Sequence, residues 1–354
     1  MFKKRLKSFR LFIGKLLIDY NSSNTDFKHT SIKKILFVRH DGKIGDYIVS
    51  SFVYDQIKKQ NPTIHIDIVA AKANEAVIEK DTNINNLFIV NSKSYVTLIS
   101  MALKLRQNGY DVLFDATPSL LRNRELLFIR IVKASLNIGY CKENYKLFNL
   151  NLPIQQAPTA IIYQQMMQLL GFKSNSIQYI IPENRKALKE SEAFLETLSK
   201  KKIIAVNLLG ASRSRKFISD KAISLIKNVL STFPNHAIVL LTYPQVNNWI
   251  KKIIDSIDSK QVVSFYGTTS IFHTASIIKY SSLVITPDTV AVHISDAYNV
   301  PLVAFYSMEE GNFIHWRSLQ ANAVIVRYQD NINQLTEVQL KGALEQSLNN
   351  TNFN

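Results

Sequence analysis

Residues Ser281–Ser307 read SSLVITPDTVAVHISDAYNVPLVAFYS and predict a strand, a turn, a helix and a second strand. The first apolar run ends at a turn fixed by Pro287, Asp288 and Thr289 stand where the helix begins, and Pro301 opens the next strand. Strands joined by a helix of this length pair in parallel through a right-handed crossover. This stretch therefore predicts an α/β fold built on a doubly wound parallel sheet.

The turn in this stretch also carries side chains suited to binding. Aspartate and threonine are favoured at helix N-caps, and the amides of a first helical turn can receive a phosphate or hydroxyl oxygen. His293 follows Asp288 and Thr289 by one helical turn, so the three residues could frame one polar corner. A capped helix with a histidine in the core explains the same spacing equally well, and the spacing leaves both interpretations open.

The alternation of strands and helices continues in both directions from this unit. In the second half, strand-like segments and intervening helical stretches fall at 201–209, 219–232, 236–244, 245–257, 261–267, 270–279, 281–288, 289–299, 301–307 and 323–328. In the first half they fall at 33–40, 46–60, 64–71, 74–80, 86–91, 94–108 and 111–117. Residues 118–171 are less regular and show two helical patterns with an extended stretch between them.

This pattern predicts two Rossmann-like domains in tandem. We expect the first domain over residues 31–185 and the second over residues 186–333, with a basic segment over 1–30 and a C-terminal helix and tail over 334–354. Ligands of such sheets bind at the carboxyl ends of the strands. We therefore expect the site in a cleft between two sets of strand ends.

Composition restricts the classes of partner. The 43 Lys and Arg residues exceed the 27 Asp and Glu residues, which gives a net charge of +16 and indicates an anionic partner. Nucleic acid, an anionic membrane surface and a phosphorylated substrate all fit this charge. Cys141 is the single cysteine, which excludes an intrachain disulfide and a cysteine metal cage and fits a reducing cytoplasm.

The first twenty residues, MFKKRLKSFRLFIGKLLIDY, carry six basic side chains before any acidic one. On a helix the apolar residues of this segment share one face, which is the pattern of a helix lying on anionic headgroups. A helix packed on the domain behind it explains the pattern equally well. A membrane anchor and a packed helix are therefore both open.

The stretch FVRHDGKIGDYIVSS, Phe37–Ser51, contains a second strand end with charged side chains. Asp46 heads the following helix, where a carboxylate within ~3 Å of a hydroxyl could accept its proton. An aspartate that only favours the helix dipole would stand at the same place. We expect Asp41 to pair with Arg39 or Lys43 and hold the loop, while Arg39 and Lys43 could also meet an anionic acceptor.

Two further basic groups lie near predicted strand or helix ends. The turn SRSRK at 212–216 could offset diphosphate charge without a metal, although basic loops in so cationic a chain are often only solvated. Within it, Lys216 is the first candidate. Arg122 and Arg124 follow the fourth strand of the first domain, where they could meet a phosphorylated acceptor or form the solvated face of a helix.

Three stretches resemble glycosyltransferase family 9, the bacterial lipopolysaccharide heptosyltransferases. PDTVAVHISDAYNVPLVAFY is similar to the family motif Asp-Thr-Gly, two residues, His and a short helix before Pro-Val, with Val290 in place of the glycine. ILFVRHDGKIGDYIVSS is similar to the family's first strand, arginine, polar turn and Gly-Asp. NLLGASRSRKF resembles its hydroxyl-rich turn and lysine. The three matches occur in the order found in the family.

The resemblance implies a glycosyltransferase-B architecture and inverting transfer of heptose from ADP-heptose to the inner core of lipopolysaccharide or lipooligosaccharide. It implies a lipid-linked acceptor, lipid A with Kdo or an extended core, and a peripheral location on the cytoplasmic face of the inner membrane. The residues that it implicates are the catalytic base Asp46 and the donor-binding group of Ser212, Lys216, Asp288, Thr289 and His293. It implies no cofactor.

Two other functions stay open. One is a glycosyltransferase of the same fold that uses another nucleotide sugar for capsule or another surface glycan. The other is a non-catalytic nucleotide- or nucleic-acid-binding protein, which is disfavoured because no standard glycine-rich phosphate loop and no basic stripe interleaved with aromatics occurs. The sequence also lacks Asp-x-Asp and any His/Cys cluster with ligand spacing, so we expect neither a metal nor a nucleic-acid partner.

Overall fold

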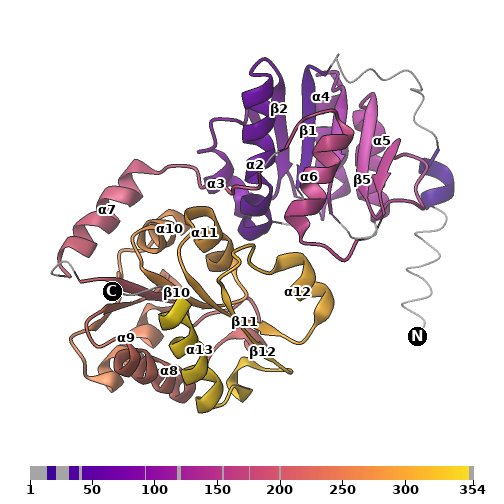
Figure 1. Ribbon diagram of the computed structural model, residues 1–354. Coiled ribbons are helices and arrows are strands. Elements are labelled where there is room, and N and C mark those ends of the chain that lie inside the picture. The colour runs from indigo at the N-terminus through magenta and orange to yellow at the C-terminus, as the bar shows by residue number, and fades with distance from the viewer. Residues whose placement is uncertain are drawn as a thin grey trace. The chain divides into compact units, whose positions relative to one another are not determined.

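The computed structural model of the chain describes residues 14–20, 32–39, 42–91, 93–117, 121–153, 155–174, 176–198 and 201–350. The chain divides into two compact units, Met1–Ile177 and Gln178–Asn354, each a sheet with helices packed against it (Figure 1). Helix α7 (Arg185–Glu196) belongs to the second unit. The expectations for Asp41 and for residues 1–13 fall outside the described residues.

The first unit contains one parallel six-stranded sheet in the order β3-β2-β1-β4-β5-β6. Its strands are β1 (Lys34–Arg39), β2 (His65–Ala70), β3 (Asn86–Ile89), β4 (Val112–Asp115), β5 (Leu136–Tyr140) and β6 (Leu150–Leu152). Its helices are α2 (Ile44–Gln60), η2 (Lys72–Asn74), α3 (Glu75–Ile78), α4 (Tyr95–Arg106), α5 (Asn123–Val132) and α6 (Thr159–Leu169). The predicted strand–helix alternation of this half is therefore confirmed.

Strand β5 is not anticipated by the sequence pattern, because Asn137 and Gly139 interrupt its apolar run. Asn137 is buried, and its Nδ2 donates to the Leu147 carbonyl oxygen at 2.9 Å. A Cβ atom on Gly139 would lie 2.5 Å from Cγ of Lys142, so this strand needs a glycine beneath the lysine. Local packing thus produces a strand where the sequence itself has only a weak strand-forming tendency.

Residues 14–20 pack on the first unit. Residues 14–18 are helical, Ile18 packs on the buried cluster formed by β1, α4 and α5, and Asp19 Oδ1 accepts a hydrogen bond of 2.9 Å from the Leu147 amide. Leu16 and Leu17 are 69% and 73% exposed. For this part of the N-terminal segment the packed arrangement is the one observed, although two of its leucines remain in solvent.

The second unit repeats the architecture with a parallel six-stranded sheet in the order β12-β11-β10-β7-β8-β9. Its strands are β7 (Ile203–Val206), β8 (Ala237–Leu240), β9 (Val262–Val263), β10 (Leu283–Pro287), β11 (Leu302–Ser307) and β12 (Val324–Tyr328). Besides α7, its helices are η3 (Arg213–Arg215), α8 (Ser219–Thr232), η4 (Pro244–Val246), α9 (Asn247–Ile257), α10 (Ile271–Lys279), α11 (Val290–Tyr298), α12 (Glu310–Trp316), η5 (Ile332–Gln334) and α13 (Glu337–Asn350).

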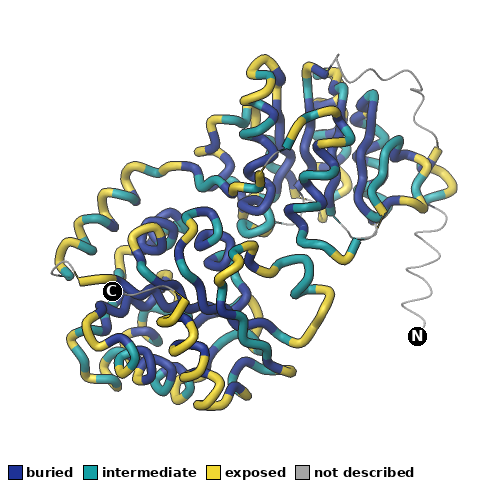
Figure 2. The backbone as a smooth tube through the Cα atoms, in the orientation of Figure 1, coloured by how far each residue is buried: buried dark blue, intermediate teal, exposed yellow. Residues whose placement is uncertain are grey.

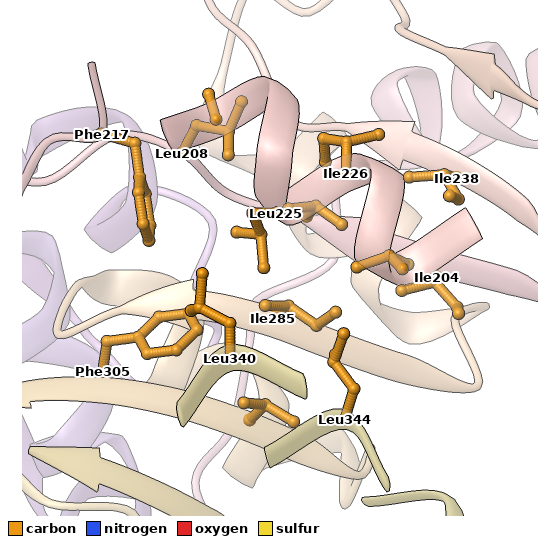
Figure 3. Close-up of a cluster of buried hydrophobic side chains, with 14 of the residues drawn as sticks. Ile204, Leu208, Phe217, Leu225, Ile226, Ile238, Ile285, Phe305, Leu340 and Leu344 are labelled. Carbon is orange, nitrogen blue, oxygen red and sulfur yellow. The ribbon is translucent and has the colours of Figure 1, made fainter. Parts of the chain in front are cut away.

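The core of the second unit lies between its sheet and helices α8, α9 and α13. Leu225 on α8 and Leu340 and Leu344 on α13 point toward Ile285 and Phe305 of the sheet (Figure 3). Each of these five residues is at most 1% exposed, and the strands of both units are largely buried (Figure 2). Burial of one such aliphatic side chain contributes about 1.5–3 kcal/mol, so this packing fixes the sheet from which the site residues project.

Both sheets therefore have the strand order of a Rossmann fold, and the predicted fold class is confirmed. In each sheet the order reverses between the first and the fourth strand of the unit. These strands are β1 and β4 in the first unit and β7 and β10 in the second. Within the described residues, no helix is long and apolar enough to span a membrane.

Candidate active site

The point where a doubly wound sheet reverses its order is where ligands bind, because the helices that follow the two strands diverge to opposite faces. Asp46 lies just beyond β1 in the first unit. Asn207 and Asp288 lie just beyond β7 and β10 in the second, where Val206 pairs with Ile285. Two of the predicted site residues, Asp46 and Asp288, therefore stand at the reversal points of their sheets.

Asp46 occupies the first turn of α2, and its carboxylate remains accessible. Its side chain is 15% exposed, and Oδ2 lies 3.9 Å from the Lys43 ammonium, whose own side chain is 67% exposed. The preceding turn contains Gly42 at φ +69, where a Cβ atom would lie 3.3 Å from Cβ of Ala71. A carboxylate held by a tight turn at a strand end has the chemistry of a proton acceptor.

Arg39 lies within the core of the first unit. It is 4% exposed, and its NH1 donates to Ser50 Oγ at 3.1 Å and to the Tyr163 hydroxyl. The Tyr47 hydroxyl, one residue beyond Asp46, donates to Asp81, and burial, together with the nearby Asp81 charge, holds the pKa of Tyr47 well above its ordinary value. Arg39 thus fixes α2 and α6 to β1 from within the core, and its predicted contact with an acceptor stays a prediction.

The predicted pair Arg122 and Arg124 begins α5. Arg122 is 59% exposed, its amide donates to Glu125 Oε2 at 2.9 Å, and its Nε lies 3.9 Å from Glu125 Oε1. The Nε of Arg124 is buried with no hydrogen-bond partner among the described residues. Both residues follow β4 at the carboxyl end of the sheet, and Arg122 keeps the exposure that an anionic acceptor would require.

A buried lysine that the sequence does not reveal lies at the same end of the first sheet. Lys142 is 0% exposed, and its ammonium donates to the carbonyl oxygens of Thr117 and Tyr140 and lies 3.9 Å from Asp115 Oδ2. A buried ammonium is retained only where it is paired and hydrogen-bonded. Lys142 therefore fixes the chain just after β4, before Arg122.

In the second unit, two segments converge on Asp288. Arg215 NH1, from η3, lies 2.8 Å from Asp288 Oδ2, and Asn312 Nδ2, from α12, donates to the same oxygen at 2.7 Å. The Asp288 side chain is 8% exposed and that of Arg215 is 24% exposed. A Cβ atom on Gly210 would lie 2.3 Å from Cβ of Arg215, so the turn after β7 needs glycine to bring the arginine here.

Thr289 caps α11 as predicted. Its Oγ1 accepts from the Ala291 amide at 3.3 Å and from Nδ2 of Asn207 at 3.0 Å. Asn207 Nδ2 also lies 3.0 Å from Thr286 Oγ1, and the backbone amide of Asn207 donates to the Ile285 carbonyl oxygen at 2.8 Å. Asn207 therefore joins the ends of β7 and β10 and sets the position of the α11 N-terminus, whose amides favour anions.

The turn SRSRK distributes its cations in different directions. Arg215 reaches Asp288, whereas the Lys216 ammonium lies 4.8 Å from the ring centroid of Trp249 on α9. Ser212 Oγ is exposed and lies 2.8 Å from Ser214 Oγ. In this arrangement Arg215, which had been ranked below Lys216, is the cation placed beside Asp288 and Thr289.

His293 is buried on α11, between the rings of Tyr179 and Trp316 at centroid distances of 6.3 and 6.1 Å. Its Nδ1 has no hydrogen-bond partner among the described residues, and burial lowers the pKa of His293 to about 4. The imidazole is therefore neutral near pH 7. It can exchange a hydrogen bond with a hydroxyl but supplies no positive charge to a phosphate.

Asp296, one turn beyond His293, ties α11 to the segment after α12. It accepts from the Ser318 hydroxyl, from the Leu319 amide at 3.2 Å and from Gln320 Nε2 at 3.1 Å. Burial raises the pKa of Asp296 to about 6. This carboxylate holds the chain after α12, which itself carries Asn312 to Asp288.

Chemically, the second unit offers the Asp288 carboxylate, the Arg215 guanidinium, the Thr289 hydroxyl and a helix N-terminus in one small region. Such a set suits a ligand with both hydroxyl and phosphate groups. No three His, Cys, Asp or Glu side chains gather as metal ligands in the part of the chain that the structure describes. Asn207 and Asn312 are the contributors that sequence reasoning missed. Asn207 opens the stretch NLLGASRSRKF but belongs neither to its hydroxyl-rich turn nor to its lysine, and Asn312 belongs to no recognisable motif.

Comparison with known proteins shows the family of this chain. The family model "Glycosyltransferase family 9 (heptosyltransferase)" matches residues 98–343. The chain belongs to glycosyltransferase family 9. It is a glycosyltransferase, as the resemblance implied, and its family is one of heptosyltransferases. The matched range begins after Asp46, whose assignment therefore depends on the motif at the end of β1 and on its place at the sheet reversal.

Several known proteins are similar to this family 9 chain over most of their length. A protein of Escherichia coli (strain K12) named "Putative lipopolysaccharide heptosyltransferase 4" is 21% identical over 313 residues, 85% of this chain and 84% of that protein. A glycosyltransferase family 9 structure from Veillonella parvula has a TM-score of 0.72 at 17% identity, covering 89% and 97% of the two chains. The structure of E. coli heptosyltransferase WaaC with ADP has a TM-score of 0.68 at 15% identity, covering 90% and 99%. These likenesses support the glycosyltransferase-B architecture.

Proposed function

We propose that this family 9 glycosyltransferase transfers heptose from ADP-heptose to the inner core of lipopolysaccharide or lipooligosaccharide with inversion at the anomeric carbon. The observation that carries the proposal is the Arg215–Asp288–Asn312 cluster beside the Thr289-capped α11 at the reversal point of the second sheet. This cluster places side chains that can bind sugar hydroxyls beside a guanidinium and helix amides that can bind a diphosphate. WaaC, a fold neighbour, was solved with ADP and with an ADP-heptose analogue.

The second unit would hold the donor. The α11 amides and the Arg215 guanidinium suit the diphosphate, Asp288 suits a sugar hydroxyl, and the neutral His293 suits a second hydroxyl. Lys216 and Ser212 would join the diphosphate if Lys216 left the Trp249 ring. The cation–π contact between these two half-buried side chains is worth about 0.5–2 kcal/mol. Charge on the leaving ADP would then be offset by protein cations rather than by a metal.

Asp46 would act as the general base. As the acceptor oxygen forms its bond to the anomeric carbon, Asp46 takes the hydroxyl proton, and the bond from that carbon to the ADP oxygen breaks with its electron pair on ADP. Attack opposite the leaving group inverts the anomeric configuration. A positioned base contributes typically 10²–10⁴-fold to such a step, so about 100-fold or more depends on Asp46.

The acceptor would be a lipid-linked anionic glycan. The net charge of +16 suits lipid A bearing Kdo or an extended core, with Arg122 and Lys43 as exposed cations of the first unit. An enzyme acting on such an acceptor would work at the cytoplasmic face of the inner membrane as a peripheral protein.

A second donor is favoured by one feature, the valine at the position of the family glycine. Val290 is the first residue of α11, where its side chain stands beside the amides that would receive the diphosphate. A larger side chain here could change how closely a donor approaches and favour another nucleotide sugar.

The test is a donor panel with Kdo-bearing lipid A as acceptor. Purified enzyme is incubated with ADP-heptose, UDP-sugars and GDP-sugars, and released nucleotide and glycosylated product are measured, with anomeric configuration read by NMR. The proposal expects product from ADP-heptose alone, with inverted configuration. Transfer from a UDP- or GDP-sugar alone would replace it with the second donor, and a retained configuration would exclude the displacement.

A further inference from the structure

A well-formed cavity of the first unit lies at the end of the sheet opposite Asp46. It has a volume of about 670 Å³, and its lining includes Tyr20, Ser135 and Asn137 beside three basic residues, Arg106, Arg130 and Lys133. Ser135 and Asn137 stand at the amino-terminal end of β5, whereas Asp46 follows the carboxyl end of β1. The cavity is therefore separate from the site described above.

The three cations converge because two helices end there. Arg106 and Arg130 lie in the last turns of α4 and α5, and Lys133 is the C-cap of α5 at φ 55. Basic residues are common at helix C-termini, so each alone could serve its helix dipole. That role does not account for their meeting around one cavity that no acidic side chain lines among the described residues.

Two of the three cations are available to a ligand. Arg106 and Lys133 are exposed and make no ion pair within the described residues. Arg130 is half-buried, with its guanidinium carbon 3.0 Å from the ring centroid of Tyr20 and NH1 donating to the Tyr20 carbonyl oxygen at 3.3 Å. Arg130 thus fastens residues 14–20 to the cavity rim, beside α5 (Figure 1).

The segment fastened there has the character of a membrane contact. Leu16 and Leu17 are 69% and 73% exposed, and Tyr20 is 54% exposed. The thirteen residues before Gly14 contain five Lys and Arg and no Asp or Glu. Exposed leucines beside a tyrosine and a set of cations can enter the boundary between headgroups and acyl chains.

We propose that the cavity at the amino end of the first sheet binds the phosphate of an anionic lipid headgroup and docks the enzyme on the membrane. Arg106 and Lys133 would contact the phosphate, Arg130 would hold Tyr20 beside it, and Leu16 and Leu17 would enter the bilayer surface. This inference rests on the proposed function in one respect: transfer to a lipid-linked acceptor is the reason for the enzyme to dock on a membrane. A strand of six residues spans ~20 Å, which leaves room for sugars between the bilayer and Asp46.

The test measures co-sedimentation of the full chain with phosphatidylglycerol–phosphatidylcholine vesicles and with pure phosphatidylcholine vesicles. The variant is R106Q/K133N, in which asparagine suits the left-handed backbone of Lys133 and the fold is kept. The matched control is K251Q/K252N, which removes two exposed charges from α9. At about 1 kcal/mol for each cation near an anionic surface, R106Q/K133N should bind anionic vesicles roughly 30-fold more weakly, and the control only slightly more weakly.

Equal binding of R106Q/K133N and K251Q/K252N to anionic vesicles would overturn the proposal. Equal binding of the wild type to both vesicle types would also overturn it. Titration with inorganic phosphate distinguishes a lipid headgroup from free phosphate. If R106Q/K133N lost phosphate binding but bound vesicles as the wild type does, the cavity would be assigned to a free anion instead. With a water-soluble acceptor, R106Q/K133N should transfer sugar at the wild-type rate. If neither the wild type nor any variant transferred sugar, the proposed function would be refuted, while the result with vesicles would still stand.

Discussion

The ion pair between Arg215 and Asp288 predicts a coupling that a double-mutant cycle can measure. The substitution Asp288→Asn keeps the shape of the side chain and an oxygen for Asn312 but removes the charge that faces Arg215 at 2.8 Å. Arg215→Gln removes the partner. The double variant completes the cycle and isolates the interaction of the two side chains.

The expected magnitude follows from the burial of the pair. Exposed ion pairs contribute about 0.2–1 kcal/mol, whereas breaking a fully buried pair costs about 3–5 kcal/mol. With Asp288 8% and Arg215 24% exposed, this pair lies between the two cases. We expect each single variant to lose about 2 kcal/mol of unfolding free energy and the double variant to lose about 1–2 kcal/mol less than the sum of the singles.

Tryptophan fluorescence reports this unfolding selectively. The chain has two tryptophans, Trp249 and Trp316, and both lie in the second unit, so urea unfolding followed by their emission monitors that unit. Glu310→Gln is the control, because it removes an ion pair to Arg327 at 3.1 Å whose glutamate is 67% exposed, and it should cost less than about 1 kcal/mol. Additive losses in the cycle would refute the placement of Arg215 on Asp288.

Three further outcomes are expected in the second unit. Gly210→Ala should weaken ADP binding about tenfold or more, because its Cβ would lie 2.3 Å from Cβ of Arg215. Gly311→Ala, whose Cβ would have nothing within 4 Å, should leave the affinity for ADP unchanged in calorimetry. Equal affinities of the two variants would contradict the role of the turn after β7. The pKa of Asp296 is raised to about 6, so its contribution to stability is full below about pH 3.8 and is lost as the pH rises through 6. Asp296→Asn should remove that loss, roughly 2 kcal/mol, from urea midpoints measured between pH 4 and 7. The pKa of His293 is lowered to about 4, so its contribution is full above pH 6.5 and is lost as the pH falls through 4. His293→Asn should therefore remove the loss of stability at falling pH, whereas Asp296→Asn removes the loss at rising pH. If both variants changed the pH profile in the same direction, the burial of one of the two residues would be contradicted.

Strong periodicity made most of the fold predictable. In residues 281–307 the apolar runs, Pro287 and Pro301 mark the ends of β10, α11 and β11 to within one or two residues, because turn chemistry and strand pattern agree. The seven-residue α12 was missed, since it is too short to show a helical period and contains Gly311. Strand β5 was missed because the packing of Lys142 on Gly139, and not an apolar run, decides it.

The positions of Asp46, Asp288 and Thr289 were predictable because a polar residue type and a strand end coincide at each, while their roles stay predictions. The site was not predictable within SRSRK, because a 3₁₀ turn has three residues per turn and sends neighbouring side chains in directions about 120° apart. The sequence therefore could not tell that Arg215 reaches Asp288 while Lys216 lies on Trp249. The burial of Arg39 was not foreseen for a similar reason, since it depends on Tyr163, 124 residues away.

The most direct measurement compares Asp46→Asn with Asp55→Asn, an aspartate on the same helix that pairs with Lys59 at 2.8 Å. Donor affinity is measured by calorimetry with ADP, and heptosyl transfer is measured in single turnover at saturating ADP-heptose and acceptor. If Asp46 is the general base, Asp46→Asn should bind ADP as the wild type does and transfer about 100-fold more slowly or worse, while Asp55→Asn should match the wild type in both. Transfer by Asp46→Asn at the wild-type rate would contradict the mechanism.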